Sequence, residues 1–316
     1  MESKNNWKAW LYLAPVIILM AVFTFYPIIN TVSISFLKNY NTLSGTHDGF
    51  TFDNYLEILT IKPSAYGAGN KPIYDKEFLY VALPNTLLIT FVTVPLSIII
   101  ALAIAIALNS IKPFKKILQT IFFMPYVTNA IAIGMVFSVI FDNDGIFNYI
   151  FKTNINWLYA GSSGTAPNYW AGFFALCVYI IWHSLPYKIL IFLGGLQNID
   201  GQYYDAAKVD GSSKWKMVRK VTIPLLSPQI LYVMITSFIG GFKEYTSVVA
   251  IFGPDGGSFL KTTGPESMRT VAYYIYDQMD SSTSLQYAAA GAVILLIIIM
   301  IFTVIQKQVA KKRVHY

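Results

Sequence analysis

The sequence predicts an all-α integral membrane protein with six transmembrane helices and with both termini in the cytoplasm. Of its 316 residues, 55% are hydrophobic and only 12% are charged, about half the charged fraction that is usual in soluble domains. The apolar residues also gather in six long stretches, and roughly 20 such residues are enough to cross a bilayer. The net charge of +7 is therefore expected to be sorted between the two sides of a membrane. A patch for nucleic acid is not expected.

Each predicted span is an apolar stretch with few or no charges. The fourth span contains His183 and Lys188, and the fifth contains Lys243 and Glu244; the other four are uncharged. The first span is too long for a signal peptide and no small-residue cleavage site follows it, so we expect it to remain as a membrane helix. The six predicted spans are Trp10–Phe36, Leu87–Leu108, Ile117–Phe141, Trp170–Leu196, Pro224–Phe252 and Ala288–Ile305.

The distribution of basic residues predicts the orientation. With the N-terminus inside, Lys and Arg are about twice as numerous in the inside segments as in the longer outside loops, as the positive-inside rule requires. We divide the chain into residues 1–84, which hold the N-terminal tail, the first span and the first outside loop, and a core transmembrane domain over residues 85–316. The core includes a cytoplasmic loop at residues 200–224.

No motif for catalysis, metal binding or nucleotide binding is recognised. The chain has one cysteine, Cys177, and its three histidines are scattered, which argues against a disulfide framework and a metal cluster. The glycine-rich stretch at residues 253–257 lacks the Lys-Ser/Thr ending of a phosphate-binding loop. We therefore expect a protein that is not an enzyme and that holds no cofactor.

The loop at residues 200–224 is predicted to fold as two short helices. The first covers residues 202–209 and ends at Gly211, which can adopt a left-handed conformation. Ser212 is expected to cap the second helix, over residues 213–221. Pro224 is expected to start the fifth span, where its missing amide proton costs little.

This loop resembles a known family motif. The run Asp205-Ala206-Ala207-x3-Gly211-x9-Val221-Thr222-Ile223-Pro224 is similar, position by position, to the E-A-A-x3-G-x9-I-x-L-P loop of ABC-importer permeases. Further similar stretches cover most of residues 10–305: Asp53-Asn54-Tyr55, Asn85-Thr86-Leu87, Phe123-Met124-Pro125-Tyr126, Gly194-Gly195-Leu196-Gln197 and Tyr273-Tyr274-Ile275-Tyr276. The chain most resembles carbohydrate-uptake permeases of the MalF type, in a shorter six-span form.

The resemblance implies a type I ABC-importer permease in a bacterial cytoplasmic membrane. Its implied partners are a second homologous permease subunit, two ATPase subunits that bind ATP and Mg²⁺, and an extracytoplasmic solute-binding protein. The loop at residues 200–224 would dock on an ATPase subunit and transmit its closure to the spans as alternating access. The residues implied in coupling are Asp205, Ala206, Ala207, Asp210, Gly211 and Pro224.

Polar residues within the fourth and fifth spans predict the substrate path, because ionisable side chains in a membrane are costly unless they line a cavity or find partners. The resemblance implies the same two stretches, Ser184–Tyr187 and Gly240–Glu244. Lys243 and Glu244, about 100° apart on a continuous helix, cannot pair with each other; a structural ion pair with another helix remains an alternative. Lys188 is expected to extend to the inner interface. The candidate path residues are His183, Ser184, Tyr187, Gly241, Lys243, Glu244 and Tyr245.

The function that these observations favour is import of an oligosaccharide or related glycan. An alternative keeps the same machinery and changes the cargo to glycerol phosphate or an acidic sugar, with which Lys243 could pair. An intramembrane glycan-processing enzyme would need clustered acids or a metal site, and a channel would need rings of charge or a filter repeat; the sequence shows neither pattern.

Overall fold

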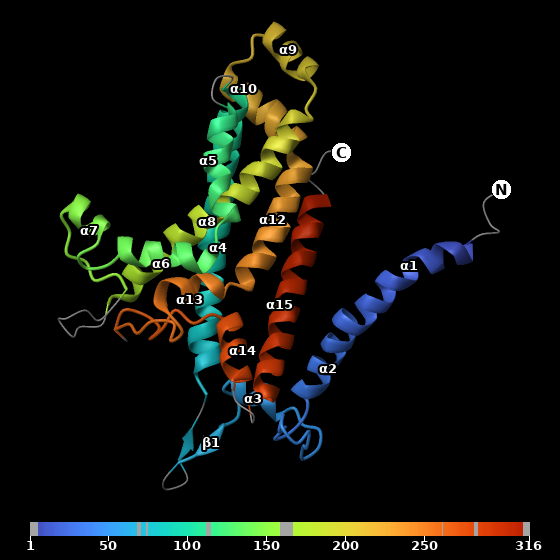
Figure 1. Ribbon diagram of the computed structural model, residues 1–316, viewed down its shortest axis with the longest axis vertical. Coiled ribbons are helices and arrows are strands. Elements are labelled where there is room, and N and C mark those ends of the chain that lie inside the picture. The colour runs from blue at the N-terminus through green and yellow to red at the C-terminus, as the bar shows by residue number, and fades with distance from the viewer. Residues whose placement is uncertain are drawn as a thin grey trace. The chain divides into compact units, whose positions relative to one another are not determined.

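The computed structural model describes residues 6–67, 71–73, 75–111, 115–158, 167–260, 262–280 and 284–311. These residues are mostly helical (Figure 1). The chain forms two compact units: unit 1 comprises Met1–Leu79 and Tyr274–Ile297, and unit 2 comprises Tyr80–Tyr273 and Ile298–Tyr316. Each unit thus combines two separate segments of the chain. The sequence-based division into the continuous ranges 1–84 and 85–316 stays a prediction.

The predicted membrane fold is confirmed. In the described part of the chain, four single helical stretches are long and apolar enough to span a bilayer: Trp10–Ser35, Phe78–Ser110, Tyr169–Gln197 and Leu285–Ala310. Two bent pairs, Ile117–Val127 with Ala130–Ile140 and Lys214–Leu225 with Ser227–Phe242, bring the number to six if each pair is one span. The orientation stays a prediction, and several cations on which it depends (Lys4, Lys112, Lys261, Lys312 and Arg313) lie outside the described residues.

Unit 1 begins with a helix that packs little of its surface within the chain. It consists of α1 (Asn6–Met20), a π-helical turn η1 (Ala21–Phe25) and α2 (Tyr26–Ser35), and its most apolar stretch has no buried residue. The loop that follows holds α3 (Asp53–Ile58) and a hairpin of β1 (Ala65–Tyr66) and β2 (Pro72–Ile73), antiparallel with Ala65 opposite Ile73. Such an apolar helix needs no cover in lipid, because its backbone hydrogen bonds are satisfied internally.

Helix α3 is fixed by polar contacts of the Asp53-Asn54-Tyr55 stretch. Asn54 is buried, and its Nδ2 donates to the carbonyl oxygens of Ser35 and Leu37 at 2.9 Å each. These carbonyls lie at the end of α2, where the helix leaves its last C=O groups without internal partners. The Tyr55 hydroxyl lies 2.6 Å from the Ser35 Oγ. This stretch therefore caps the first span.

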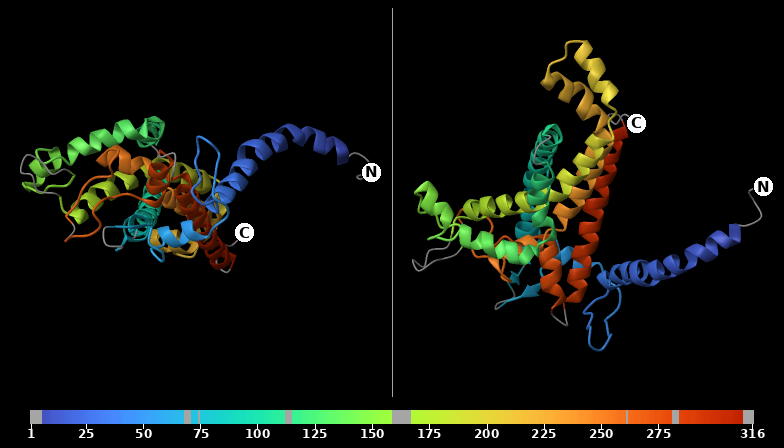
Figure 2. Two further views of the ribbon diagram at one scale, coloured as in Figure 1. Left: turned by 90° about the horizontal axis from the view of Figure 1, so that it is seen from below. Right: turned by 45° about the horizontal axis from the view of Figure 1, so that its top comes forward.

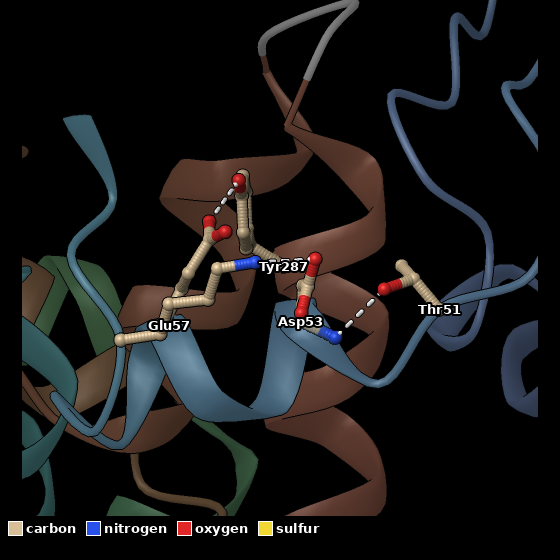
Figure 3. A network of polar contacts seen from close by, with 5 residues as sticks. Thr51, Asp53, Glu57 and Tyr287 are labelled. Atoms are coloured by element: carbon tan, nitrogen blue, oxygen red, sulfur yellow. Dashed lines mark hydrogen bonds and ion pairs between the residues drawn. The ribbon is translucent and has the colours of Figure 1, made fainter.

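The same helix is tied to the start of α15 (Leu285–Lys311). The Tyr287 hydroxyl donates to Glu57 Oε2 at 2.6 Å, and Lys62 pairs with Asp53 at 2.6 Å (Figure 3). The hydrogen bond from Lys62 lowers the pKa of the partly exposed Asp53 carboxyl, although ion pairs that reach solvent contribute little to stability. Both contacts lie within unit 1.

Three long helices form the core of unit 2. A π-helical turn η2 (Phe78–Ala82) leads into α4 (Leu83–Ser110), which packs against both α8 (Tyr169–Gln197) and α12 (Ser227–Phe242). The buried residues Ala101 and Ala105 lie on α4 in one cluster with Phe192 of α8. Their small side chains allow the close helix approach that is common in membrane bundles.

The predicted third span, Ile117–Phe141, was wrong as a continuous helix. α5 (Lys115–Val127) and α6 (Ala130–Ile140) meet at an angle of 100°, and a short α7 (Ile146–Phe151) follows. Asn129 lies between α5 and α6 with extended backbone angles, and its side chain accepts hydrogen bonds from the amides of Ile131 and Ala132. An asparagine in this position starts a new helix, and the uniformly apolar sequence concealed the break.

The predicted fifth span, Pro224–Phe252, was also wrong as one helix. Its first residues belong to a segment made of α10 (Lys214–Met217), η3 (Val218–Thr222) and α11 (Ile223–Leu225), which is bent by 68° from α12. Pro224 therefore lies in α11 and does not start the long helix. α12 ends at Phe242, directly after two glycines, and a separate α13 (Thr246–Phe252) follows. Lys243 and Glu244 occupy this break, so the expected 100° separation on a continuous helix does not apply.

A buried asparagine joins α4 to the loop before α14 (Val271–Met279). Asn85 has no exposed surface. Its Nδ2 donates to the carbonyls of Ser267 and Arg269 at 2.8 Å each, and its Oδ1 accepts from the Tyr169 hydroxyl at 2.7 Å. One side chain thus connects three segments of unit 2 that are far apart in the sequence.

Candidate functional site

One candidate site is the two-helix loop at the end of unit 2. α9 (Gly201–Val209) and α10 lie beyond the ends of α4 and α5 (Figures 1 and 2). No residue of either helix is buried. Asp200 caps α9, because its side chain accepts a hydrogen bond from the Gln202 amide. The Tyr204 hydroxyl lies 3.2 Å from Thr222 Oγ1, which holds α9 against η3.

The turn between the two short helices depends on Gly211. Its φ is +65°, and a Cβ added there would meet nothing within 4 Å. The constraint is therefore the backbone conformation and not lack of space. The Gly211 amide donates to the Lys208 carbonyl and the Ser212 amide to the Ala207 carbonyl, which satisfies the end of α9. The cap of the second helix is Ser213, whose Oγ accepts from the Lys216 amide; the prediction of Ser212 was wrong by one residue.

The structure brings most of the predicted coupling residues together around this turn. Asp205 is exposed on α9 and pairs with Lys208 at 2.7 Å. Ala206 follows it, and the Ala206 carbonyl accepts from the Asp210 amide at 3.1 Å. Pro224 lies apart, in α11 at the far end of the second helical segment. The coupling role of all six residues stays a prediction.

Three apolar side chains on this loop are exposed, and two of them, Tyr203 and Val209, were not singled out from the sequence. Tyr203 is 56% exposed, Val209 is 89% exposed and Trp215 is 73% exposed. Large apolar side chains on an otherwise charged loop are a signal of a contact surface, and they were already visible in the sequence among the lysines. They add an apolar component to the predicted docking loop.

A second candidate site is a cavity of about 280 Å³ in unit 2, close to the lower limit of roughly 300–1,000 Å³ for ligand pockets. It lies among α4, α8 and α12, and Tyr126 of α5 contributes to it. Hydroxyl, glycine and ionisable residues line it together with a few apolar ones. The lining residues are Thr93, Val94, Tyr126, Ile180, His183, Ser184, Tyr187, Lys188, Thr236, Ser237, Gly240, Gly241 and Glu244.

Five of the seven predicted path residues line this cavity: His183, Ser184, Tyr187, Gly241 and Glu244. Lys243 is exposed and lies outside the lining. Tyr245 also lies outside it, with its ring 5.5 Å from that of Tyr273. Among the described residues no ion pair of Lys243 or Glu244 is present, so the alternative of a structural ion pair has no support in this chain. The role of the seven residues in transport stays a prediction.

The carboxylate of Glu244 is positioned by the break between α12 and α13. Its Oε1 accepts a hydrogen bond from the Ser247 amide at 3.0 Å, and its backbone carbonyl accepts from the Thr270 hydroxyl. The first contact satisfies a free amide at the start of α13. Glu244 is thereby held at the edge of the cavity by its own chain.

The prediction that the side chain of Lys188 extends to the inner interface was wrong. Its side chain is only 5% exposed, and its Nζ donates to the hydroxyl oxygens of Ser97 on α4 and Ser184 on α8. The close packing of α4 on α8 places Ser97 beside it. The nearest polar partners of this lysine are therefore inside the bundle, and it lines the cavity.

Aromatic and glycine residues shape the rest of the cavity. The rings of Tyr126 and Tyr187 are stacked, with centroids 6.2 Å apart and an interplanar angle of 18°. Tyr126 was not identified from the sequence, because tyrosines are too abundant in this chain to single out one. A Cβ on Gly241 would lie 3.0 Å from Thr90 Cγ2, whereas Gly240 has nothing within 4 Å. Gly241 thus allows α12 to approach α4, and Gly240 leaves the cavity open.

Comparison with known proteins gives one family. The family described as "Binding-protein-dependent transport system inner membrane component" matches residues 94–315. The chain is 30% identical to the lactose transport system permease protein LacF of Rhizobium radiobacter, over 97% of this chain and 95% of that protein. It is 29% identical to the arabinooligosaccharides transport system permease protein AraP of Bacillus subtilis, over 95% of this chain and 88% of that protein.

Solved structures show the same fold. A chain of a bacterial alginate ABC transporter, solved in complex with an alginate pentasaccharide-bound periplasmic protein, superposes with a TM-score of 0.73 at 17% identity. The match covers 97% of this chain and 95% of that one. At this identity the match establishes the fold alone.

Proposed function

Because this chain belongs to the family of binding-protein-dependent transport system inner membrane components, we propose that it forms the translocation path of an ATP-driven importer for an oligosaccharide or related glycan. The relatives named as permeases for lactose and for arabinooligosaccharides support a carbohydrate as the cargo. The chain is a multi-pass membrane subunit of such a transporter.

The cavity is the single observation that carries the proposal. Several of its lining groups can exchange hydrogen bonds with sugar hydroxyls: Ser184, Thr236, Ser237, His183 and Glu244. Tyr126 and Tyr187 add aromatic faces against which a sugar ring can pack. Polar groups that converge on one cavity beside aromatic faces are typical of small-molecule sites.

The partners belong to the proposal as well. A second homologous permease would complete the path, and a solute-binding protein outside the membrane would deliver the glycan. The related alginate transporter was solved with a periplasmic protein that carries its ligand, which supports this arrangement. Two ATPase subunits would bind ATP and Mg²⁺, and this chain would hold neither.

The loop around Gly211 would transmit movement between the ATPase and the cavity. Tyr203, Val209 and Trp215 offer apolar contacts to a protein surface, and Asp205 offers a polar one. The second helical segment continues through α11 into α12, which contributes Thr236, Ser237 and Gly240 to the cavity. A displacement of the loop would therefore move one wall of the cavity directly.

Uptake by the reconstituted importer tests the proposal. The chain, its second permease, its ATPase subunits and its binding protein are placed in proteoliposomes and offered a panel of neutral and acidic oligosaccharides. We expect accumulation of at least one glycan that requires both ATP inside and binding protein outside. Accumulation of amino acids or metal ions with no glycan taken up would overturn the assignment of a carbohydrate cargo.

The second cargo class, glycerol phosphate or an acidic sugar, rested on Lys243. That residue is exposed outside the cavity, so it no longer supports an anionic cargo. The cation that does line the cavity is Lys188.

A further inference from the structure

The cavity contains a buried cation without a counter-ion. Lys188 is 5% exposed, and among the described residues the ion pairs are Lys62 with Asp53 and Lys208 with Asp205. No described carboxylate is therefore paired with Lys188. A charge in a membrane-spanning bundle is costly when it is unpaired, so the ammonium group provides a strong site for an anion.

The two serines around Lys188 are arranged to hold an ammonium. The Ser97 hydroxyl donates to the Val94 carbonyl, and the Ser184 hydroxyl donates to the Ile181 carbonyl. Since each serine hydrogen is committed to the backbone, each oxygen presents lone pairs to the Lys188 Nζ. Lysine has three N–H donors. Two are used by the serines, and one is left on a side chain that lines the cavity.

Among the described residues, Glu244 is the one carboxylate in the cavity lining, and it is held by a partner other than Lys188. Its Oε1 is held by the Ser247 amide at the edge of the cavity, at the break after α12. A carboxylate accepts hydrogen bonds well from hydroxyl groups. It cannot bind an anionic group in this way, because such a group has no hydrogen to donate. The cavity lining thus contains one cationic group and one carboxylate, and these have different hydrogen-bond partners.

We propose that Lys188 is the anion-binding subsite of this importer, so that the transported glycan is an acidic sugar. An oxyanion of the sugar, a carboxylate or a sulfate, binds the free N–H of Lys188, while the sugar hydroxyls bind Glu244 and His183. This inference rests on the proposed function and narrows its substrate class. It also makes Lys188 a determinant of specificity.

The test compares three trisaccharides of equal length in the reconstituted importer: trigalacturonate, a sulfated maltotriose and neutral maltotriose. The wild-type importer is expected to take up one or both of the acidic probes at least about tenfold faster than maltotriose. The difference in uptake rate between trigalacturonate and the sulfated maltotriose shows whether the site prefers a carboxylate or a sulfate. Equal or faster uptake of maltotriose overturns the proposal and leaves the carbohydrate importer intact, whereas no uptake of any glycan rejects both.

Substitution then assigns the effect to one residue. Lys188→Met removes the charge with little change of length, and both serines keep their carbonyl partners, so the bundle is expected to assemble. The expected loss in kcat/KM for the acidic probe is about 10- to 100-fold, as for loss of a charge-assisted hydrogen bond. Lys188→Arg retains the charge and is expected to keep the preference for the acidic probe.

Two further variants provide the comparison. Lys307→Met removes an exposed cation of α15 outside the cavity and controls for the loss of one positive charge. Lys243→Met tests the cation that the sequence favoured. If Lys243→Met loses uptake of the acidic probe while Lys188→Met takes it up normally, the anion site is at Lys243 and the proposal is overturned. If Lys188→Met does not assemble, the preference of the wild-type importer between acidic and neutral probes still decides the question.

Discussion

At the scale of single residues, the cavity depends on side chains whose partners come from other helices. The sequence predicted His183 and Glu244 in the substrate path because ionisable residues are costly in an apolar span, and the family resemblance implied Ser184. It could not predict the position of Lys188, because its partner Ser97 is 91 positions away in the sequence. Only the packing of α4 on α8 brings the two together.

Glu244 accepts a hydrogen bond at the start of α13 and is proposed to bind the glycan, and two substitutions distinguish these two roles. Glu244→Gln keeps an oxygen that can accept from the Ser247 amide but removes the charge, whereas Glu244→Ala removes both. We expect Glu244→Gln to lower glycan uptake about tenfold, equivalent to about 1.4 kcal/mol, at wild-type yield in detergent. Glu244→Ala is expected to lose, in addition, about 0.5–2 kcal/mol of stability with the contact that starts α13.

Uptake in proteoliposomes and the midpoint of thermal unfolding in detergent measure these two effects separately. If Glu244→Gln transports at the wild-type rate, the carboxylate does not act on the substrate. The residue would then serve only as the cap of α13.

Asn85 is expected to be a determinant of stability with no part in transport. Its buried side chain bonds two backbone carbonyls and the Tyr169 hydroxyl, and a buried polar group left without a partner costs about 1–3 kcal/mol. Asn85→Ala should therefore lower the thermal midpoint strongly. The matched variant Tyr169→Phe removes one of the three contacts and should lower it less; equal midpoints for Asn85→Ala and the wild type would contradict this role.

At the scale of elements, the sequence predicted which stretches are apolar but not where they break. Ile117–Phe141 reads as one span because its composition is uniform, and the bend of 100° depends on a single side chain, Asn129. The end of α12 follows Gly240 and Gly241, which are weak helix formers, but glycine pairs also occur within continuous membrane helices. The number of spans was therefore more predictable than their shape.

The turn at Gly211 gives the prediction at this scale. Gly211→Val places a β-branched residue at φ +65°, a conformation that such residues adopt only with strain. We expect the two short helices to lose their fixed angle, so that glycan no longer stimulates ATPase activity, while the membrane helices remain assembled. Gly211→Asn is expected to retain much of the stimulation, because asparagine tolerates this conformation.

Gly201→Ala is the matched control on the same loop, since its added Cβ meets nothing within 4 Å and its φ is not positive. Stimulation of ATPase activity by the binding protein and glycan, relative to basal activity, is the quantity to compare. Normal stimulation in Gly211→Val would show that the left-handed turn is not required for coupling.

At the scale of the whole molecule, the chain leaves much apolar surface uncovered. The most apolar part of Trp10–Ser35 has no buried residue, although the end of this span is capped by Asn54. Such a surface is stable in lipid, where packing between helices and not water exclusion drives association. The low charged fraction already predicted this property, because it required lipid as the solvent.

We propose that the cavity among α4, α8 and α12 is the substrate path and opens alternately to the two sides of the membrane. Ser237→Cys, in a Cys177→Ala background, introduces one thiol into its lining. Ser237 suits this exchange because its buried Oγ has no hydrogen-bond partner in the described part of the chain. The assay measures the reaction rate of the thiol with a water-soluble maleimide in the reconstituted importer.

If the cavity is the substrate path, this rate is expected to change about tenfold or more between the nucleotide-free state and a state trapped with ATP and binding protein, and the transported glycan is expected to slow it. A thiol at Lys307→Cys, outside the cavity, should react at the same rate in both states. Equal rates for the Ser237→Cys thiol in the two states, with no protection by the glycan, would contradict the assignment of this cavity as the substrate path.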